Sequence, residues 1–309
     1  MSSPVAGVRV LCVGHASVDH LFEIDTLPAP PAKTAARKHW RVVGGMSANA
    51  SVAAARLGAK VAFAGPVGDD EAAPLIEAHF AAEGIDSRRL LRVALARSSV
   101  SAVLIDGQGE RLIVTHRGDA LQRAPAFDSA WLDGIDVLLV DPRCPAWAAA
   151  ALAAARERGI ASILDADVAP RDDLRRLVAL ARWAVFSEPG LAAFDAGAPE
   201  AALAAALACG ARHAVVTLGE RGLLWLQPDA PLRRLEAFAV APVVDTTAAG
   251  DVFHGALGVA LAEGQADAAA LRFAAAAAAL KCLRPRGAHG APSRAEVETL
   301  LAGPRAASG

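Results

Sequence analysis

The stretch that decides the fold is Val243-Val244-Asp245-Thr246-Thr247-Ala248-Ala249-Gly250-Asp251-Val252-Phe253-His254-Gly255-Ala256. The β-branched residues at its start predict a buried strand, and the small residues that follow predict a turn. A helix is then expected to begin near Ala249. The first N–H groups of a helix have no acceptor within the helix, so this turn could bind a phosphate through the backbone of Ala248, Ala249 and Gly250.

Asp251 stands directly after these small residues. A carboxylate beside a bound phosphate repels the phosphate, so its presence there calls for a function that outweighs the repulsion. One such function is general base catalysis: Asp251 would accept the proton of a substrate hydroxyl while the hydroxyl oxygen attacks phosphorus. The alternative is an ordinary strand–turn–helix, in which the aspartate only favours the positive end of the helix dipole.

Outward from this stretch, predicted strands alternate with predicted helices. The strands are Val8–Val13, Lys60–Gly65, Val137–Val140, Ile160–Leu164, Trp183–Phe186 and Ala214–Leu218. The helices are Met46–Leu57, Asp70–Glu83, Pro145–Arg158, Leu174–Ala181 and Pro199–Cys209. This alternation indicates a doubly wound α/β fold with a mostly parallel sheet covered by helices on both faces. Ligands are then expected at the edge formed by the carboxyl ends of the strands.

A second group of extended segments does not follow that rhythm: Ser17–Asp25, Thr34–Val43, Ser99–Ile105 and Arg111–His116. The last two flank Asp106-Gly107-Gln108-Gly109, which predicts a hairpin. We expect these segments to pair into a small β-sheet lid, formed by about 15–43 and 97–118 and inserted into a single domain spanning 1–309. The outer face of such a sheet needs a cover, which predicts a homodimer through the lids.

Two weaker signals precede and follow the middle of the chain. Val215–Gly222 is a buried strand that ends in a glycine-containing turn, which could admit a nucleotide close to its backbone or could be a plain turn. Gly44-Gly45 before a helix suits either a hinge or a closely approaching ligand. Asn49 and Asp19 could hydrogen-bond sugar hydroxyls, although a surface Asn and a solvated Asp are the simpler interpretations.

Composition excludes several classes of function. The chain has 309 residues, 54% of them hydrophobic, and a formal net charge of −2, which argues against a nucleic-acid partner. Met1–Gly7 lacks the basic and apolar character of a signal peptide, and no apolar run approaches the roughly 20 residues of a membrane span. The four cysteines form no CxxC pair. We therefore expect a cytoplasmic protein without a membrane partner.

In this order, these segments resemble the ribokinase-like carbohydrate kinases, the PfkB family. Gly44–Gly58 resembles the N-terminal signature of that family, Gly65–Asp70 its next segment, and Asp245–Asp251 its C-terminal signature DTxGAGD. The resemblance covers nearly the whole chain. It implies an ATP-dependent sugar kinase with Mg²⁺, a β lid and often a dimer.

The resemblance also implies roles for single residues. Asp251 resembles the catalytic base, and Ala248, Ala249 and Gly250 resemble the anion hole for the transferring phosphoryl group. The residues that resemble sugar contacts are Asp19, Gly44, Gly45 and Asn49. Those expected at the nucleotide are Ser187, Thr217, Gly219, Gly222, Lys281 and Gly287. Which residues would bind the metal ion stays unknown from the sequence.

Within the family, three stretches resemble the bacterial sulfofructose kinases, with ketohexokinase more distant: Phe186–Leu191, Asp251–Leu257 and Ala279–Pro285. That resemblance implies a ketohexose-type substrate, with 6-deoxy-6-sulfofructose as one candidate. Arg143 could then contact an anionic group of the substrate. Thr26 and Thr115 stand where the subgroup has Gly and Asn, so a plain or phosphorylated ketose stays open.

Two departures from the family pattern concern the phosphate end. The first Gly of the usual GAGD is Ala248 here, which adds a methyl group beside the phosphate path. The N-x-x-E motif that helps to order Mg²⁺ and phosphate is replaced by Ser187-Glu188-Pro189-Gly190, in which the second motif position, Gly190, lacks a carboxylate.

Three other functions fit the sequence less well. A non-catalytic sugar sensor on the same fold would need a damaged base or anion hole, whereas Asp251 and the small residues are present. A nucleoside kinase would favour aromatic stacking, and the chain has no Tyr and 5% aromatic residues. A dinucleotide enzyme is rejected because Val13-Gly14-His15-Ala16-Ser17 lacks G-x-G-x-x-G.

Overall fold

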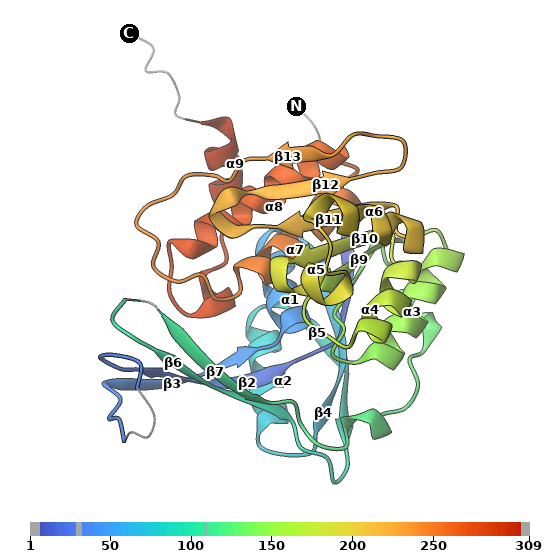
Figure 1. Ribbon diagram of the computed structural model, residues 1–309. Helices are drawn as coiled ribbons and strands as arrows, with labels where there is room; N and C mark the ends of the chain where they lie inside the picture. The colour runs from blue at the N-terminus through green and yellow to red at the C-terminus, as the bar shows by residue number, and fades with distance from the viewer. Residues whose placement is uncertain (1–6, 29–32, 109, 304–309) are drawn as a thin grey trace.

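The computed structural model describes residues 7–28, 33–108 and 110–303 (Figure 1). Within them, the larger sheet has nine strands in the order β13-β12-β11-β10-β9-β8-β1-β4-β5. Those from β11 to β5 pair in parallel, while β12 and β13 add to one edge in antiparallel fashion. The strands are β1 (Arg9–Val13), β4 (Lys60–Gly68), β5 (Asp86–Val93), β8 (Val137–Val140), β9 (Ala161–Ala166), β10 (Trp183–Ser187), β11 (His213–Thr217), β12 (Leu223–Leu226) and β13 (Arg233–Leu235).

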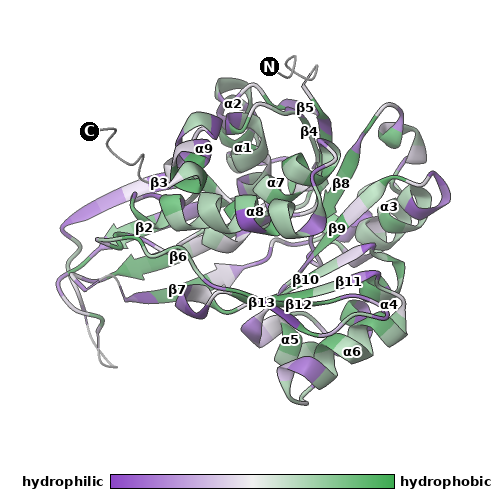
Figure 2. Ribbon diagram, turned by 90° about the horizontal axis from the view of Figure 1, so that it is seen from above, coloured by the Kyte–Doolittle hydropathy of each residue, from purple (hydrophilic) through white to green (hydrophobic). Residues whose placement is uncertain are grey.

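Helices cover both faces of this sheet, and each face has its own apolar core (Figure 2). Because side chains alternate along a strand, Val10 and Cys12 of β1 belong to one core and Leu11 and Val13 to the other. The first core is covered by α1 (Met46–Arg56), α2 (Ala72–Ala82), α7 (Ala249–Ala262), α8 (Asp267–Cys282) and α9 (Arg294–Ala302). The second is covered by α3 (Pro145–Glu157), α4 (Arg171–Leu180), α5 (Glu188–Phe194) and α6 (Pro199–Cys209). The predicted doubly wound α/β fold is confirmed.

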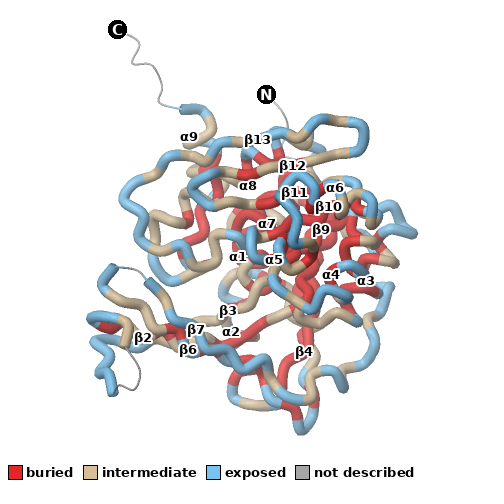
Figure 3. The backbone as a smooth tube through the Cα atoms, in the orientation of Figure 1, coloured by how far each residue is buried: buried red, intermediate tan, exposed pale blue. Residues whose placement is uncertain are grey.

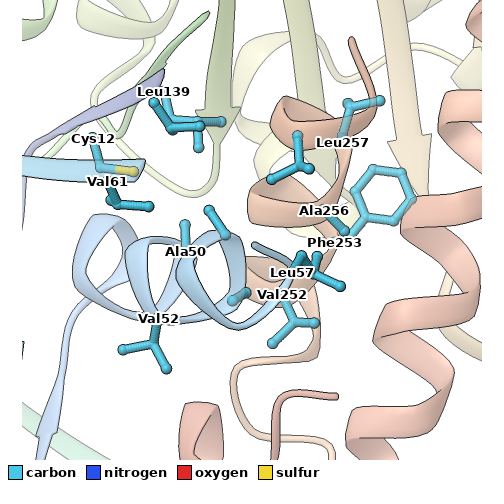
Figure 4. Packing of buried hydrophobic residues seen from close by; sticks show 14 of the residues in the cluster. Cys12, Ala50, Val52, Leu57, Val61, Leu139, Val252, Phe253, Ala256 and Leu257 are labelled. Atoms are coloured by element: carbon cyan, nitrogen blue, oxygen red, sulfur yellow. The ribbon is translucent and has the colours of Figure 1, made fainter. Parts of the chain in front are cut away.

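Helices α1 and α7 pack closely, as Figure 4 shows for the cluster around Ala50, Val252 and Ala256. A Cβ atom at Gly255 would lie 2.4 Å from the carbonyl oxygen of Ala50, so this position requires glycine. The buried residues of α1 are mostly alanine and serine, which lets the two backbones approach. This contact fixes the first turns of the two helices relative to each other, and those turns carry Asn49 and Asp251.

The smaller sheet has the order β3-β2-β6-β7 and extends away from the main body (Figures 1 and 3). Its strands are β2 (Ser17–Glu23), β3 (Lys38–Gly44), β6 (Ser99–Ile105) and β7 (Arg111–His116). The separate sheet expected from the sequence is therefore present. Strands β6 and β7 pair in antiparallel fashion, as the hairpin signal predicts. Gly109 of that hairpin, residues 29–32 of the predicted lid segment and the ends 1–6 and 304–309 of the predicted domain lie outside the described residues.

The strand expected at Val243-Val244 is wrong. These side chains are 57% and 47% exposed, and the segment is irregular. The amides of Val244 and Asp245 both donate to the carbonyl oxygen of Cys282 at the end of α8. Pro242 has no N–H to donate to a strand neighbour, and the chain must cross from the edge strand β13 to α7. The two valines have a high intrinsic strand propensity, but the path of the chain between β13 and α7 prevents them from pairing as a strand.

Other elements carried too weak a pattern to be predicted. The edge strand β5 was not predicted because its three arginines interrupt the apolar pattern. Its residues are only partly buried, which is typical of an edge strand. Helix α8 is so rich in alanine that it shows no clear apolar face. Short 3₁₀ helices complete the described chain: η1 (Leu121–Arg123), η2 (Ser129–Leu132), η3 (Gly219–Arg221) and η4 (Gly287–Gly290).

In the part of the chain that the structure describes, no single helix is both long enough and apolar enough to cross a bilayer. Only a bent pair, α5 with α6, meets those criteria when its two members are taken together.

Candidate active site

A cavity of about 700 Å³ lies between the small sheet and the first turns of α1, α3 and α7. Strand alternation decides which side chains of the small sheet face it, since every second residue points the same way. The sheet residues that line the cavity include Ser17, Asp19, Leu21, Ser101, Val103, Ile105, Ile113 and Thr115. The main domain contributes Asn49, Arg143, Asp245, Thr247, Asp251 and Gly287, among others.

Asp251 lies in the first turn of α7 and faces α1. The side-chain amide of Asn49 donates to Asp251 Oδ2 at 2.7 Å. The pKa of Asp251 is raised to about 8, mainly by burial and also by the nearby Asp165 carboxyl group, while the bond from Asn49 opposes the shift. A carboxyl group with a pKa near neutrality is suited to accept a proton in the working pH range.

The start of α7 opens onto empty space at Gly250. A Cβ atom built there would meet no heavy atom within 4 Å. Ala248, the N-cap residue, has φ 62°, a left-handed conformation that costs a non-glycine residue about 1 kcal/mol. The amide of Ala249 makes a 3.3 Å bond to the carbonyl oxygen of Thr246. Of the three amides expected to form the anion hole, that of Ala249 therefore has an intramolecular acceptor already.

Asp245 organises the turn before α7. Its Oδ1 accepts from the amide of Thr247 at 2.7 Å, and its Oδ2 accepts from the amide of Gly287 at 3.0 Å. The ammonium of Lys281 lies 3.0 Å from the same Oδ2. Burial alone would raise the pKa of Asp245, but the bonds from Thr247 and Gly287 and the charge of Lys281 outweigh it and lower the pKa. The carboxylate thus stays ionised and ties the turn to η4.

The sequence analysis missed Arg111, which bonds to the cavity residue Thr247 without lining the cavity itself, and His15, which does line it. Arg111, on β7, donates to the hydroxyl oxygens of Thr247 at 2.5 Å and Thr246 at 2.6 Å, and so links the small sheet to the start of α7. His15 lines the cavity, and its Nε2 is buried without a hydrogen-bond partner among the described residues. No local motif marks either residue, because the contacts of Arg111 join positions more than 130 apart in sequence.

The predicted sugar contacts meet in this cavity. Burial raises the pKa of Asp19, while bonds from Ser17 and Ser101 oppose the rise. A Cβ atom at Gly44 would lie 1.9 Å from Asp19 Oδ2, and one at Gly45, which has φ 101°, would lie 2.4 Å from a backbone oxygen. Both positions need glycine for packing, whether or not a ligand approaches.

Arg143 also lines the cavity, but its guanidinium already has partners. It donates to Asp167 Oδ2 at 3.0 Å and to the carbonyl oxygen of Val168 at 2.7 Å. An anionic substrate would have to replace these bonds. Thr115 faces the cavity and lies 3.3 Å from the hydroxyl of Ser101, whereas Thr26 is exposed and does not line it.

The residues expected at the nucleotide lie mostly outside this cavity. Ser187 and Thr217 are register partners at the ends of β10 and β11. The hydroxyl of Ser187 donates to Asp167 at 2.7 Å, and that of Thr217 donates to the carbonyl oxygen of Phe186 at 3.3 Å. Gly219, Gly222 and Lys281 are likewise not among the lining residues, whereas Gly287 is.

A group of carboxylates stands behind Asp251 at the ends of β8 and β9. Burial raises the pKa of Asp165 well above its usual range, with Asp167 and Asp141 adding to the rise. His254 Nδ1 lies 3.4 Å from Asp165 and 2.7 Å from the carbonyl oxygen of Gly250. Carboxylate oxygens are the donors that Mg²⁺ uses together with substrate phosphates, and the partly exposed Asp167 fits that ion better than the buried Asp165, whose raised pKa favours the neutral acid. At the changed N-x-x-E motif, a Cβ atom on Gly190 would lie 2.1 Å from the carbonyl oxygen of Ala166, which leaves no room for a glutamate.

Comparison with known proteins adds independent findings. Residues 8–294 match the model of the pfkB family carbohydrate kinases. The ribokinase of Bacillus subtilis (strain 168) is 31% identical over 298 residues, which cover 95% of this chain and all of that protein. A crystal structure from Agrobacterium tumefaciens, provisionally named a ribokinase, has 36% identity and a TM-score of 0.91 over 96% of this chain and 98% of its own. Arabidopsis thaliana ribokinase, solved with ribose and ATP, has 26% identity and a TM-score of 0.84 over 96% and 99% of the two chains.

Proposed function

The chain belongs to the pfkB family of carbohydrate kinases, and we propose that it transfers the γ-phosphoryl group of ATP to a hydroxyl of a small sugar, with a pentose such as ribose as first candidate. It is a phosphotransferase that acts on a sugar hydroxyl. The observation that carries the proposal is the placement of Asp251 at the open start of α7, in one cavity with Asp19 and Asn49.

Asp251 takes the proton of the attacking hydroxyl in this scheme. Asn49 holds one carboxylate oxygen at 2.7 Å, which leaves the other to face the substrate. As the hydroxyl loses its proton to Asp251, its oxygen forms a bond to the γ-phosphorus and the bond to the leaving oxygen of ADP breaks. The raised pKa makes Asp251 a stronger base than an ordinary aspartate.

The start of α7 receives the transferring group. The space in front of Gly250 admits phosphate oxygens, and the first amides of the helix, together with its dipole, stabilise their charge. ATP binds together with Mg²⁺, which would neutralise phosphate charge, and Asp167 is the residue that would hold the ion directly or through water. Arg111 adds a positive charge from the small sheet, bonded to Thr246 and Thr247.

The pentose proposal rests on the names of the similar proteins and on the polar lining of the sugar end. Asp19, Ser17, Asn49 and the unpartnered His15 Nε2 can bond several hydroxyl groups. A ketohexose or 6-deoxy-6-sulfofructose stays a prediction from the sequence, and the engagement of Arg143 with Asp167 speaks against an anion contact there. A nucleoside kinase is a compatible alternative within the family.

We further propose that the small sheet closes over the sugar and carries a dimer contact. Opposite the cavity-facing side chains, it exposes Val100, Leu112 and Val114, which are 37%, 47% and 65% exposed. Burying such a face against a second copy would remove it from water. A chain that sediments as a monomer at micromolar concentration would defeat this part of the proposal. The cytoplasmic location stays a prediction.

The deciding experiment measures ADP release from ATP and Mg²⁺ with a panel of sugars: ribose, fructose, fructose 6-phosphate, 6-deoxy-6-sulfofructose and inosine. Asp251→Asn serves as the matched control, since it removes proton acceptance with little change in size. We expect ribose to give the highest kcat/KM and the variant to lose about a thousandfold in kcat. Sugar binding by calorimetry without sugar-dependent ADP release would instead identify a sensor. Turnover of the variant within a few-fold of the parent would remove Asp251 from the role of base.

A further inference from the structure

Lys281 is a lysine with no exposed side-chain surface, in the last turn of α8. Its Nζ lies 2.6 Å from the carbonyl oxygen of Asp245, 3.0 Å from Asp245 Oδ2 and 3.3 Å from the carbonyl oxygen of Arg284. Burying an ammonium group is costly unless it is paired and fully hydrogen-bonded. Three oxygens for three N–H donors meet that requirement.

Because these oxygens use all of its donors, Lys281 has none left for ATP. It also does not line the cavity. The nucleotide contact expected from the sequence therefore has no support in the geometry. The ammonium instead joins the end of α8 to both the backbone and the side chain of Asp245.

Asp245 passes this restraint on to the phosphate end of the site. Its two carboxylate oxygens accept from the amides of Thr247 and Gly287, which fixes the turn before α7 and the start of η4. Thr247 and Gly287 line the cavity, and Ala248 follows as the N-cap of α7. The direction of the first amides of α7 thus depends on a carboxylate that the buried ammonium holds in place.

We propose that Lys281 is a positioning residue that acts as a tethered cation: its ammonium holds Asp245, and through it the start of α7, in the orientation that receives the transferring phosphoryl group. This inference rests on the proposed function. Two carbonyl oxygens and a carboxylate around one ammonium form an oxygen-lined cage of the kind that binds a small monovalent cation. In the parent protein the side chain fills that cage permanently.

Shortening the side chain should empty the cage, which makes chemical rescue the test. We expect Lys281→Ala to lower kcat about 100-fold with a smaller change in the sugar KM, because the effect falls on transition-state orientation. Adding NH₄Cl or KCl at constant ionic strength should raise the kcat of Lys281→Ala at least about tenfold. Tetramethylammonium chloride is too large for the cage and should restore nothing. Lys281→Met, whose apolar chain still fills the space, should respond to none of these salts.

Controls separate this proposal from folding and from the proposed function. Lys60→Ala, at an exposed lysine, should behave like the parent in every salt. Circular dichroism and thermal unfolding show whether Lys281→Ala is folded. If it is not, the parent itself gives the answer: turnover should be the same in sodium, potassium and ammonium salts, and activation by more than about threefold would overturn the proposal.

The remaining outcomes are equally distinct. A folded Lys281→Ala with kcat within about threefold of the parent, or with a loss that no cation restores, refutes the tethered-cation role and leaves the kinase assignment standing. A parent without sugar-dependent ADP release refutes the proposed function, whatever the variants do.

Discussion

The two ends of the proposed site both use glycine, but for opposite reasons. At the start of α7, a Cβ atom on Gly250 would meet nothing within 4 Å, so glycine leaves space that no part of the chain fills. At the β11–β12 turn, a Cβ atom on Gly222 would lie 2.0 Å from the carbonyl oxygen of Leu235, so glycine permits backbone packing. Gly250 is exposed, and Gly219 in the β11–β12 turn is equally open, so the open space at Gly250 suits a ligand only because it lies beside Asp251, which lines the cavity. The close contact at Gly222 is explained by the fold alone.

Polar side chains show the same contrast. Around Asp245, groups from α8, η4 and the small sheet converge on one turn that borders the cavity. At the other end, Ser187 bonds to Asp167, which directly follows strand β9, and Thr217 bonds to Phe186 on the neighbouring strand β10. Open space bordered by hydrogen-bond donors from several elements indicates a catalytic site better than polar groups that bond to their neighbours. Single substitutions at the two ends can test this distinction.

Among the substitutions that test this contrast, the largest effect is expected for Gly250→Ala. We expect kcat to fall about 100-fold, because a methyl group would occupy space that phosphate oxygens need. The free energy of unfolding should stay the same or rise by up to about 1 kcal/mol, since Gly250 has helical geometry and alanine favours helices. Steady-state kinetics and urea denaturation measure the two quantities.

Gly255→Ala is the matched control on the same helix. Its methyl group would lie 2.4 Å from the carbonyl oxygen of Ala50, so it should destabilise the packing of α1 on α7. If Gly250→Ala lost stability as Gly255→Ala does, the space at Gly250 would have a structural purpose and the contrast between the two ends would fail.

At the other end, Gly222→Ala should cost about 3 kcal/mol of unfolding free energy, because φ 79° and the contact with Leu235 both oppose a side chain. The folded fraction should keep its KM for ATP within about threefold. Chemical denaturation and ATP titration check these values. A stable variant with a much higher KM for ATP would instead assign Gly222 to the nucleotide, as the sequence suggested.

The pH dependence follows from the pKa of about 8 for Asp251. The deprotonated carboxylate is the base, so kcat/KM for the sugar should rise about tenfold per pH unit below 8 and level off above it. Asp165, His254 and Asp141 are the titratable groups whose charges act on the pKa of this carboxyl group, and they should shift the midpoint of the profile rather than its direction. A flat profile between pH 6 and 8 would contradict this role.

The same shift has an opposite consequence for stability. The folded state holds the Asp251 proton up to about pH 8, whereas the unfolded state loses it near 4, so the unfolding free energy should fall as pH rises through that window. Asp251→Asn removes this contribution, and its thermal midpoint should therefore exceed that of the parent more at pH 8 than at pH 5. Differential scanning calorimetry measures both.

The smallest effect is expected for Arg111→Ala. Its bonds to Thr246 and Thr247 join the small sheet to α7, and we expect a loss of about fivefold in kcat/KM for the sugar from weaker closure. Arg88→Ala, at an exposed arginine of β5, is the control and should change nothing. Equal behaviour of the two variants would remove Arg111 from the site.

Much of the fold could be predicted from the sequence, because apolar strands and helices with Gly or Pro at their ends encode their geometry locally. Helix α6 was predicted to the residue, and the start of α7 was placed correctly. The edge strand β5 and the false strand at Val243-Val244 show the limit. Whether each of these segments forms a strand depends on the segments beside it in the fold, and the periodicity of its own sequence contains no information about those neighbours.

The candidate site divides in the same way. Asp19, Asn49 and Asp251 were predicted from motifs, and the structure brings all three to one cavity. Arg111 and His15 were missed, because their importance depends on contacts between distant segments. Lys281 was predicted to contact the nucleotide. Its burial and its three oxygen partners could not be predicted, because they exist only after α8 packs against the turn at Asp245.

By itself, the sequence determined the class of chemistry: a turn of small residues and an aspartate at a helix start, within a family of carbohydrate kinases. Tertiary structure alone decided which glycines leave space and which permit packing, and which charges face a substrate and which hold the backbone. The physical reason is that residue type limits what a side chain can do, whereas its burial and partners depend on chain segments far away in sequence.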